Sequence, residues 1–172
     1  IKEYEDTLTR LEFLRKQYDD MQESKEDLLN IIDDIDETIK IKFKDNFNII
    51  QGYFSEIFQN LFGGGEAKIY ISDESDILNS GIEIEARPPG KSMQSLSLLS
   101  GGEKTLTAIA LLFAVLKSKP SPFCILDEID AALDDANISK YTAYLDRIKD
   151  ETQFILITHR KVTMEISDAI YG

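Results

Sequence analysis

The sequence predicts an α/β fold, in which a parallel sheet is flanked by helices and preceded by a long coiled-coil helix. Residues 1–45 contain no Pro or Gly and repeat apolar residues in steps of four and three, which is the period of a coiled-coil seam. Two short apolar runs, 122–126 and 153–157, suit buried strands of a parallel sheet. Helical patterns over 105–116 and 136–148 alternate with these runs, and such alternation is typical of an α/β layer.

The composition limits what the chain can be. Its 172 residues suffice for one domain with a core plus an appendage, and 42% of them are hydrophobic. The net charge of −13 argues against an extensive nucleic-acid surface, so any basic contact must be local or come from a partner. The single cysteine, Cys124, can form no internal disulfide and suits a reducing cytoplasm. We find no signal-peptide or membrane-spanning pattern, and the start at Ile1 suggests a fragment of a longer protein.

The first 45 residues have two interpretations. The narrow apolar stripe favours a coiled-coil helix that needs a partner outside this chain, with one stammer between Leu11 and Leu14. The alternative is an amphipathic helix packed on its own domain. From Phe43 the apolar face broadens, so we expect the helix to enter a globular core and to end at Gly63-Gly64-Gly65.

The pattern of residues 67–92 predicts a hairpin, and the end of this segment resembles a phosphate-binding loop only superficially. Alternation over 67–71 and 81–86 indicates two strands joined by the acidic turn 72–80. Pro89-Gly90-Lys91-Ser92 ends like a Walker A loop, but Glu85 occupies the position of the first glycine. No apolar helix begins at Ser92, and a P-loop needs strand, loop and helix in succession. We therefore reject a P-loop here.

The stretch Leu99-Ser100-Gly101-Gly102-Glu103-Lys104 precedes an apolar helix that we expect to be buried on both sides. Ser100 and Glu103 have the spacing of a capping box. The two glycines allow another molecule to approach the backbone, and a helix N-terminus with free N–H groups suits a phosphate. The stretch is therefore either a well-capped helix or a phosphate site.

Polar residues follow both predicted parallel strands. Asp127 and Glu128 come directly after the first, at the sheet edge where α/β proteins bind ligands. One such acid can hold Mg²⁺ and the next can act as general base, although a pair of acids alone is often only a solvated loop. His159, the only histidine, follows the second strand, where it could contact a γ-phosphate or be structural. Asp134 could cap the next helix, hold a loop across a subunit boundary, or do both.

Together these residues resemble one superfamily, the ABC ATPases. Leu99-Ser100-Gly101-Gly102-Glu103 resembles the signature motif, Phe123 to Glu128 resembles Walker B, Ala132-Leu133-Asp134 resembles the D-loop, and Ile157-Thr158-His159 resembles the switch histidine. Within that superfamily the chain resembles structural maintenance of chromosomes (SMC) proteins, and bacterial ones more than eukaryotic ones. The motifs that carry this resemblance are Pro-Pro-Gly-Lys at 88–91, Asp-Glu-Ile-Asp-Ala-Ala-Leu-Asp at 127–134 and Thr-His-Arg-Lys at 158–161.

The resemblance implies that residues 1–45 are a coiled-coil neck and residues 46–172 are the C-terminal lobe of an ATPase head. An N-terminal lobe of the same protein would bring Walker A, so this fragment alone is expected to be inactive. ATP and Mg²⁺ would lie against Asp127 (metal), Glu128 (general base) and His159. The signature residues would contact in trans the ATP held by a second, like head, with Asp134 in the D-loop.

The resemblance also implies the wider setting of the chain. The expected function is ATP-driven chromosome condensation and segregation, in the cytoplasm and associated with the nucleoid. The expected partners are a second SMC head, a kleisin subunit, and DNA through the assembled complex, with no membrane. Alternatives are the head of a coiled-coil DNA-repair ATPase, an ABC transporter ATPase subunit, or a structural coiled coil without turnover.

Overall fold

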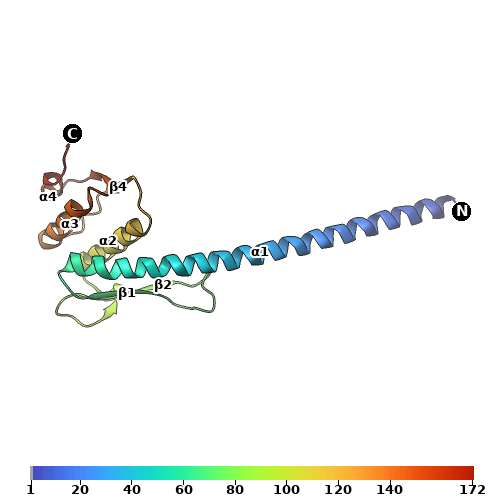
Figure 1. Cartoon of the computed structure of the whole chain (residues 1–172), viewed down its shortest axis with the longest axis horizontal. Helices are drawn as coiled ribbons and strands as arrows, with labels where there is room; N and C mark the ends of the chain where they lie inside the picture. Colours follow the sequence, from blue (N-terminus) through green and yellow to red (C-terminus); the bar gives the residue numbers. More distant parts are fainter. Residues whose placement is uncertain (1) are drawn as a thin grey trace. The chain divides into compact units, whose positions relative to one another are not determined.

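The computed structural model describes residues 2–172 and divides into two compact units, one ending at Lys44 and the other spanning Asp45–Gly172. Helix α1 (Lys2–Phe62) supplies the whole of the first unit and the beginning of the second (Figure 1). In the first unit the apolar stripe is exposed, with about half or more of Leu14, Tyr18, Leu28 and Ile32 open to solvent. A stripe of this kind is typical of a coiled-coil seam.

In the second unit α1 becomes a core helix and then stops where the sequence predicts. Phe54, Ile57, Phe58 and Leu61 are fully buried. The helix ends at Phe62, and Gly63, Gly64 and Gly65 all have positive φ, which is a backbone conformation that favours glycine. The predicted glycine stop is therefore confirmed.

The predicted hairpin is also present, with a third strand that the sequence analysis missed. Strands β1 (Glu66–Ile71) and β2 (Ile82–Arg87) pair in antiparallel register, and β3 (Gln94–Ser95) adds to the free edge of β2. A single 3₁₀ turn, η1 (Leu96–Leu98), then leads to helix α2 (Gly101–Ser118). This helix begins directly after the predicted cap Ser100 and is longer than the expected 105–116.

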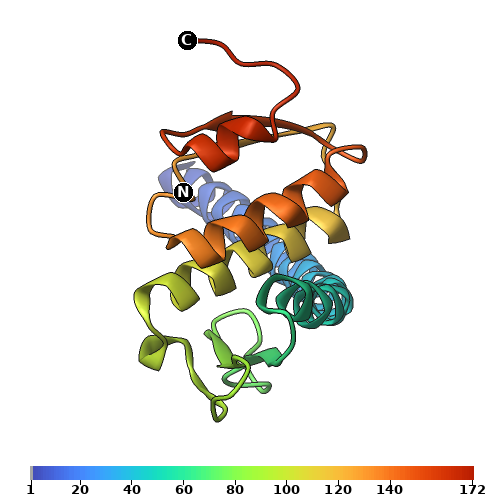
Figure 2. The same cartoon turned by 90° about the vertical axis from the view of Figure 1, so that its left-hand side faces the viewer.

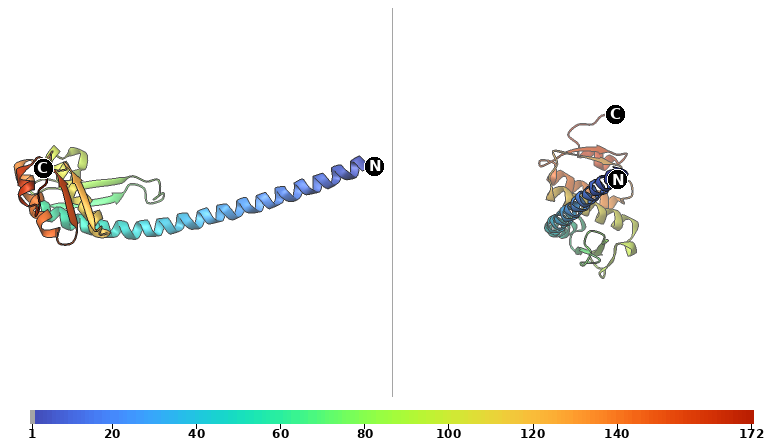
Figure 3. Two further views of the ribbon diagram at one scale, coloured as in Figure 1. Left: turned by 90° about the horizontal axis from the view of Figure 1, so that it is seen from above. Right: turned by 90° about the vertical axis from the view of Figure 1, so that its right-hand side faces the viewer.

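The rest of the chain alternates strand and helix: β4 (Phe123–Asp127), α3 (Asp135–Ile148), β5 (Gln153–Ile157) and the short α4 (Lys161–Glu165). Strands β4 and β5 form a parallel pair (Figure 3). In this pair Asp127 lies opposite Ile157. In Figure 2 the hairpin and the β4–β5 pair lie on opposite sides of a helical layer that contains α2 and α3.

The core of the second unit is aromatic and lies between these layers. Phe113 of α2 is 1% exposed, and its ring centroid lies 5.2 Å from that of Tyr144 and 6.3 Å from those of Tyr141 and Phe154. Burial is the main reason that the pKa of Tyr144 rises to about 12, and the pKa of Tyr141 is raised further.

Two burial expectations are wrong. Strands β4 and β5 were expected to be covered on both faces, but Phe123, Ile125, Ile155 and Ile157 are each between 45% and 56% exposed. Helix α2 was expected to be buried on both sides, but Leu112 and Val115 are 41% and 46% exposed. An apolar sequence pattern indicates that a face can be buried, but a face is buried only when another element packs on it. In this chain other elements pack on only one face of the β4–β5 pair and on one side of α2. Among the described residues, no helix has the length and apolar character needed to cross a membrane.

Candidate functional site at the ends of the parallel strands

Two of the predicted site residues meet at the carboxyl ends of β4 and β5. Glu128 Oε1 lies 3.2 Å from His159 Nε2, so the two side chains are within hydrogen-bond reach when that nitrogen carries a proton. Both are open to solvent, with 53% of the Glu128 side chain and 88% of the His159 side chain exposed. The pair can therefore be reached by a ligand that approaches this sheet edge.

The backbone of Glu128 is unusual. It has φ of 49°, and it is the only non-glycine with positive φ among the described residues. Its N–H donates to the carbonyl of Ile157 at 2.9 Å, which continues the β4–β5 ladder by one residue. A left-handed non-glycine costs about 1–3 kcal/mol and persists only where its surroundings enforce it. The chain leaves the strand at this residue, and the Glu128 carboxylate lies beside His159.

Asp127 is the residue that could hold a magnesium ion. It is exposed at the last position of β4, beside Glu128. The described residues contain no group of three His, Cys, Asp or Glu side chains arranged to hold a metal. A single carboxylate still fits Mg²⁺, because this ion keeps several waters and takes other oxygens from substrate phosphates. Asp127 is therefore compatible with magnesium that arrives with a nucleotide.

The buried carboxylate of Asp130, which the sequence motifs do not single out, bonds to residues that follow β5 at this edge. Asp130 is 2% exposed, and its Oδ2 accepts hydrogen bonds from the hydroxyls of Thr158 at 2.7 Å and Thr163 at 2.5 Å. Arg160 Nη2 donates to the carbonyls of Leu133 at 2.9 Å and Ala131 at 3.3 Å. The loop after β4 is thus held to the loop after β5 by side chains on both sides of His159.

At the start of α2 the capping box is confirmed. Glu103 Oε2 accepts from the Ser100 N–H at 3.1 Å and from the Ser100 hydroxyl at 2.7 Å. Leu99 is 4% exposed, so its side chain anchors the segment and is not open to a ligand. A side chain added at Gly101 would meet no atom within 4 Å, so the first turn of the helix is open there. The groups available to a phosphate are therefore Ser100 and the amides of the two glycines.

Asp134 has the capping role that the sequence allowed. Its Oδ1 accepts from the N–H of Asn137 at 2.8 Å at the start of α3. The same turn lies against the start of α2, since a Cβ built at Gly102 would be 3.2 Å from Asn137 Nδ2 and 3.7 Å from Asp134 Oδ2. A side chain at position 102 would therefore require Asn137 to shift by a few tenths of an ångström. The structure thus brings Asp134 to the signature-like segment, and Glu128 to His159.

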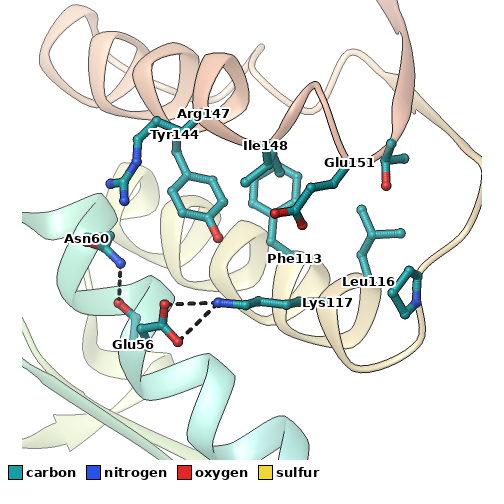
Figure 4. Close-up of a pocket in the computed structure, with 11 residues that line it drawn as sticks. Glu56, Asn60, Phe113, Leu116, Lys117, Tyr144, Arg147, Ile148 and Glu151 are labelled. Atoms are coloured by element: carbon teal, nitrogen blue, oxygen red, sulfur yellow. Dashed lines mark hydrogen bonds and ion pairs between the residues drawn. The ribbon is translucent and has the colours of Figure 1, made fainter.

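A separate pocket of about 170 Å³ contains none of the predicted site residues (Figure 4). It lies among the end of α1, α2 and α3, and Glu56 pairs there with Lys117 at 3.0 Å. Tyr144 and Phe113 form its apolar wall. We place the functional site at the sheet edge and not in this pocket, because the chemically competent residues are at the edge.

Comparison with known proteins shows the family of the chain. Residues 3–172 match the family model described as RecF/RecN/SMC N terminal domain. The chain belongs to this SMC family. It is 50% identical over 172 residues to the chromosome partition protein Smc of Bacillus subtilis, covering all of this chain and 14% of that protein. The chain therefore spans about one seventh of the curated relatives that it matches.

Solved SMC structures share the fold. One, from a study of ATP-driven dimerisation and DNA-stimulated activation of SMC ATPases, is 44% identical with a TM-score of 0.72, covering 77% of this chain and 81% of that chain. Another is the Smc head domain of Pyrococcus furiosus with an extended coiled coil, bound to the C-terminal domain of ScpA. It is 40% identical with a TM-score of 0.73, covering 97% of this chain and 42% of that chain. The chain thus has an α/β fold like that of the SMC ATPase head.

Proposed function

We propose that this chain is the C-terminal lobe of the ATPase head of a bacterial SMC protein, with part of the adjoining coiled coil, and that it acts in ATP-driven chromosome condensation and segregation. The observation that carries the proposal is the approach of Glu128 and His159 at the carboxyl ends of two parallel strands. The family model's description names an N terminal domain, so the assignment to one lobe rests on the motifs. Segments that resemble the signature, Walker B, D-loop and switch-histidine motifs all lie in this chain, and in the proposed assignment these motifs belong to the C-terminal lobe.

The geometry around Lys91 supports the same assignment. Gly90 and Lys91 are the last two residues of a turn in which the Lys91 N–H donates to the Pro88 carbonyl at 3.1 Å and Gly90 has φ of 79°. Proline followed by such a glycine is typical of a type II turn, and a short strand comes next instead of a helix. A Walker A loop would then come from the N-terminal lobe, and this lobe alone would not hydrolyse ATP. Residues 1–45 would be the coiled-coil neck and 46–172 the lobe.

The exposed faces of β4 and β5 support the proposal that a second lobe packs on this chain. Phe123 and Ile125 of β4 and Ile155 and Ile157 of β5 present apolar surface to solvent. Strands of an all-parallel sheet are covered on both faces in folded α/β proteins. We propose that the N-terminal lobe of the same protein covers this surface and completes the sheet.

In this proposal the residues of the chain divide the chemistry between them. Glu128 would accept a proton from the attacking water, and His159 would contact the γ-phosphate of the same nucleotide. Asp127 would hold Mg²⁺ through its water shell, and the ion would neutralise phosphate charge. Ser100 and the amides of Gly101 and Gly102 would contact in trans the ATP of a second, like head, with Leu99 and Glu103 shaping the segment and Asp134 at the boundary between heads.

The relatives support a proposal for the partners. One of the SMC structures is an Smc head domain bound to the C-terminal domain of ScpA, so we propose a kleisin subunit of that kind as a partner. DNA would be held through the assembled complex, in the cytoplasm and associated with the nucleoid. The curated relatives are chromosome partition proteins, and no observation favours a DNA-repair head or a transporter subunit instead.

Substitution of Glu128 in the full protein tests the proposal. Glu128→Gln should keep ATP binding, stall hydrolysis and accumulate engaged dimers, measured by phosphate release and by analytical ultracentrifugation. Glu151→Gln, an exposed acid before the start of β5, is the matched control and should hydrolyse like the wild type. Wild-type turnover by Glu128→Gln would remove Glu128 as the general base.

Substitution of Ser100 tests the trans arrangement. Ser100→Arg should leave ATP binding by one head intact and abolish ATP-dependent dimerisation, because the long side chain would occupy the space of the incoming phosphate. Loss of nucleotide binding by the monomer would instead show that the segment acts on its own head's nucleotide.

A further inference from the structure

Lys91, which belongs to the rejected Walker A-like segment, has a defined partner. Its Nζ lies 2.9 Å from Glu103 Oε1 and 2.9 Å from Glu103 Oε2. Oε2 is also the atom that accepts both bonds from Ser100. Lys91, Glu103 and Ser100 therefore form one connected network at the N-terminus of α2.

The network holds Glu103 in its charged form. The hydrogen bond from Lys91 is the largest cause that lowers the pKa of Glu103, and bonds from Ser100 lower it further against the effect of burial. The Glu103 side chain is 16% exposed and Lys91 is 47% exposed. A charged carboxylate is thus fixed within the first turn of the helix, with one ammonium group to balance it.

The backbone delivers Lys91 from a stiff turn. Pro88 and Pro89 have restricted φ, and Gly90 closes the turn with φ of 79°. Gly65 packs underneath, where an added Cβ would be 2.4 Å from the Arg87 carbonyl and 3.3 Å from Pro89 Cδ. The backbone at Lys91 is therefore held by the stiff turn and by its packing against Gly65.

The charge of Glu103 matters for the proposed trans site. A carboxylate in the first turn favours the helix itself, but it repels a phosphate that binds the same helix end. Ser100 would have to turn its hydroxyl from Glu103 to such a phosphate, which would leave the carboxylate less satisfied. A cation that stays on Glu103 reduces both effects.

We propose that Lys91 is a positioning residue for the signature segment: it neutralises and holds Glu103, so that the Ser100 hydroxyl and the two glycine amides can donate hydrogen bonds to the triphosphate of the opposite head. This inference rests on the proposed function. Lys91 itself need not touch the nucleotide, and its action is through Glu103.

A double-mutant cycle in the full protein tests this, with every variant carrying Glu128→Gln to retain engaged dimers. Lys91→Ala should weaken ATP-dependent dimerisation at least about tenfold, measured as the dimer dissociation constant by analytical ultracentrifugation, without changing ATP binding by one head. In the Glu103→Gln background the same lysine substitution should raise the dimer dissociation constant less than about threefold. Glutamine retains a capping box and carries no charge to neutralise. Lys91→Arg should restore dimerisation.

Lys117→Ala is the matched control. Lys117 lies at the other end of the same helix and pairs with Glu56 at 3.0 Å (Figure 4), so its loss should leave dimerisation unchanged. An equal loss for Lys91→Ala with and without Glu103→Gln would overturn the neutralising role, and wild-type dimerisation by Lys91→Ala would overturn the inference entirely. Failure of the Glu128→Gln reference to dimerise with ATP would refute the proposed function, and the inference with it.

Discussion

The buried carboxylate of Asp130 provides the sharpest test of how the sheet edge is held together. Asp130 is 2% exposed, and its carboxylate accepts hydrogen bonds from the hydroxyls of Thr158 and Thr163. Thr163 lies on α4 and is 1% exposed. Thr163→Val removes one hydroxyl and keeps nearly the same shape, so it withdraws one of these donors from a buried charge.

The size of the effect follows from the charge of the acceptor. A hydrogen bond to a charged group contributes about 1.5–3 kcal/mol, compared with about 1 kcal/mol for a neutral pair. We therefore expect Thr163→Val to lower the free energy of unfolding by about 1.5–3 kcal/mol. Thr142→Val is the matched control: Thr142 is 5% exposed, but its hydroxyl donates to helix carbonyls of Ile138 at 3.1 Å and Ser139 at 3.2 Å. Its loss should cost less than about 1 kcal/mol.

Urea unfolding of the chain, followed by near-UV circular dichroism of the packed tyrosines, measures both variants. The midpoint of Thr163→Val should fall while the slope of the transition stays that of the wild type. Equal costs for Thr163→Val and Thr142→Val would refute the reasoning, because the charge of Asp130 would then add nothing to the bond.

Three further outcomes are expected. Phe113→Ala should lower the free energy of unfolding by about 3–5 kcal/mol, measured in urea, because it empties the aromatic core beside Tyr144. Gly65→Ala should lower the melting temperature measured by circular dichroism, because φ is 87° and the new methyl would lie 2.4 Å from the Arg87 carbonyl. The pKa of Glu103 is lowered on folding, so its contribution to stability is present above the unfolded value near 4.5 and is lost as the pH falls through the folded value. The wild type should accordingly exceed Glu103→Gln in stability at neutral pH, and urea titrations below pH 4.5 should show that advantage shrinking.

The features that the sequence predicts well are those that nearby residues determine. The capping box joins Ser100 to Glu103, three residues apart, and the helix stop depends on three consecutive glycines. The approach of Glu128 to His159 was also predictable, because parallel strands bring the residues that follow them to one edge. In each case the chemistry of neighbouring residues, or the rule that parallel strands end at the same edge, is sufficient to predict the feature.

The features that were missed depend on contacts between distant segments. Lys91 was dismissed together with its P-loop, although the N3 position of Glu103 leaves one carboxylate oxygen available to a cation. Asp130 bonds to Thr163, 33 residues further along the chain, and no spacing rule connects them. The exposure of Ile125 was missed because an apolar strand has the same pattern whether or not its second face is covered.

The two parts of the proposed site are connected within this one chain. Arg160, the residue after His159, donates to the Leu133 carbonyl at 2.9 Å, and Asp134 follows directly and caps α3. Asp134 in turn lies against Gly102 at the start of α2. The packed groups are therefore continuous from the residue after His159 to the signature-like segment, and double-mutant cycles between Arg160 and Asp134 would measure the energetic coupling along them.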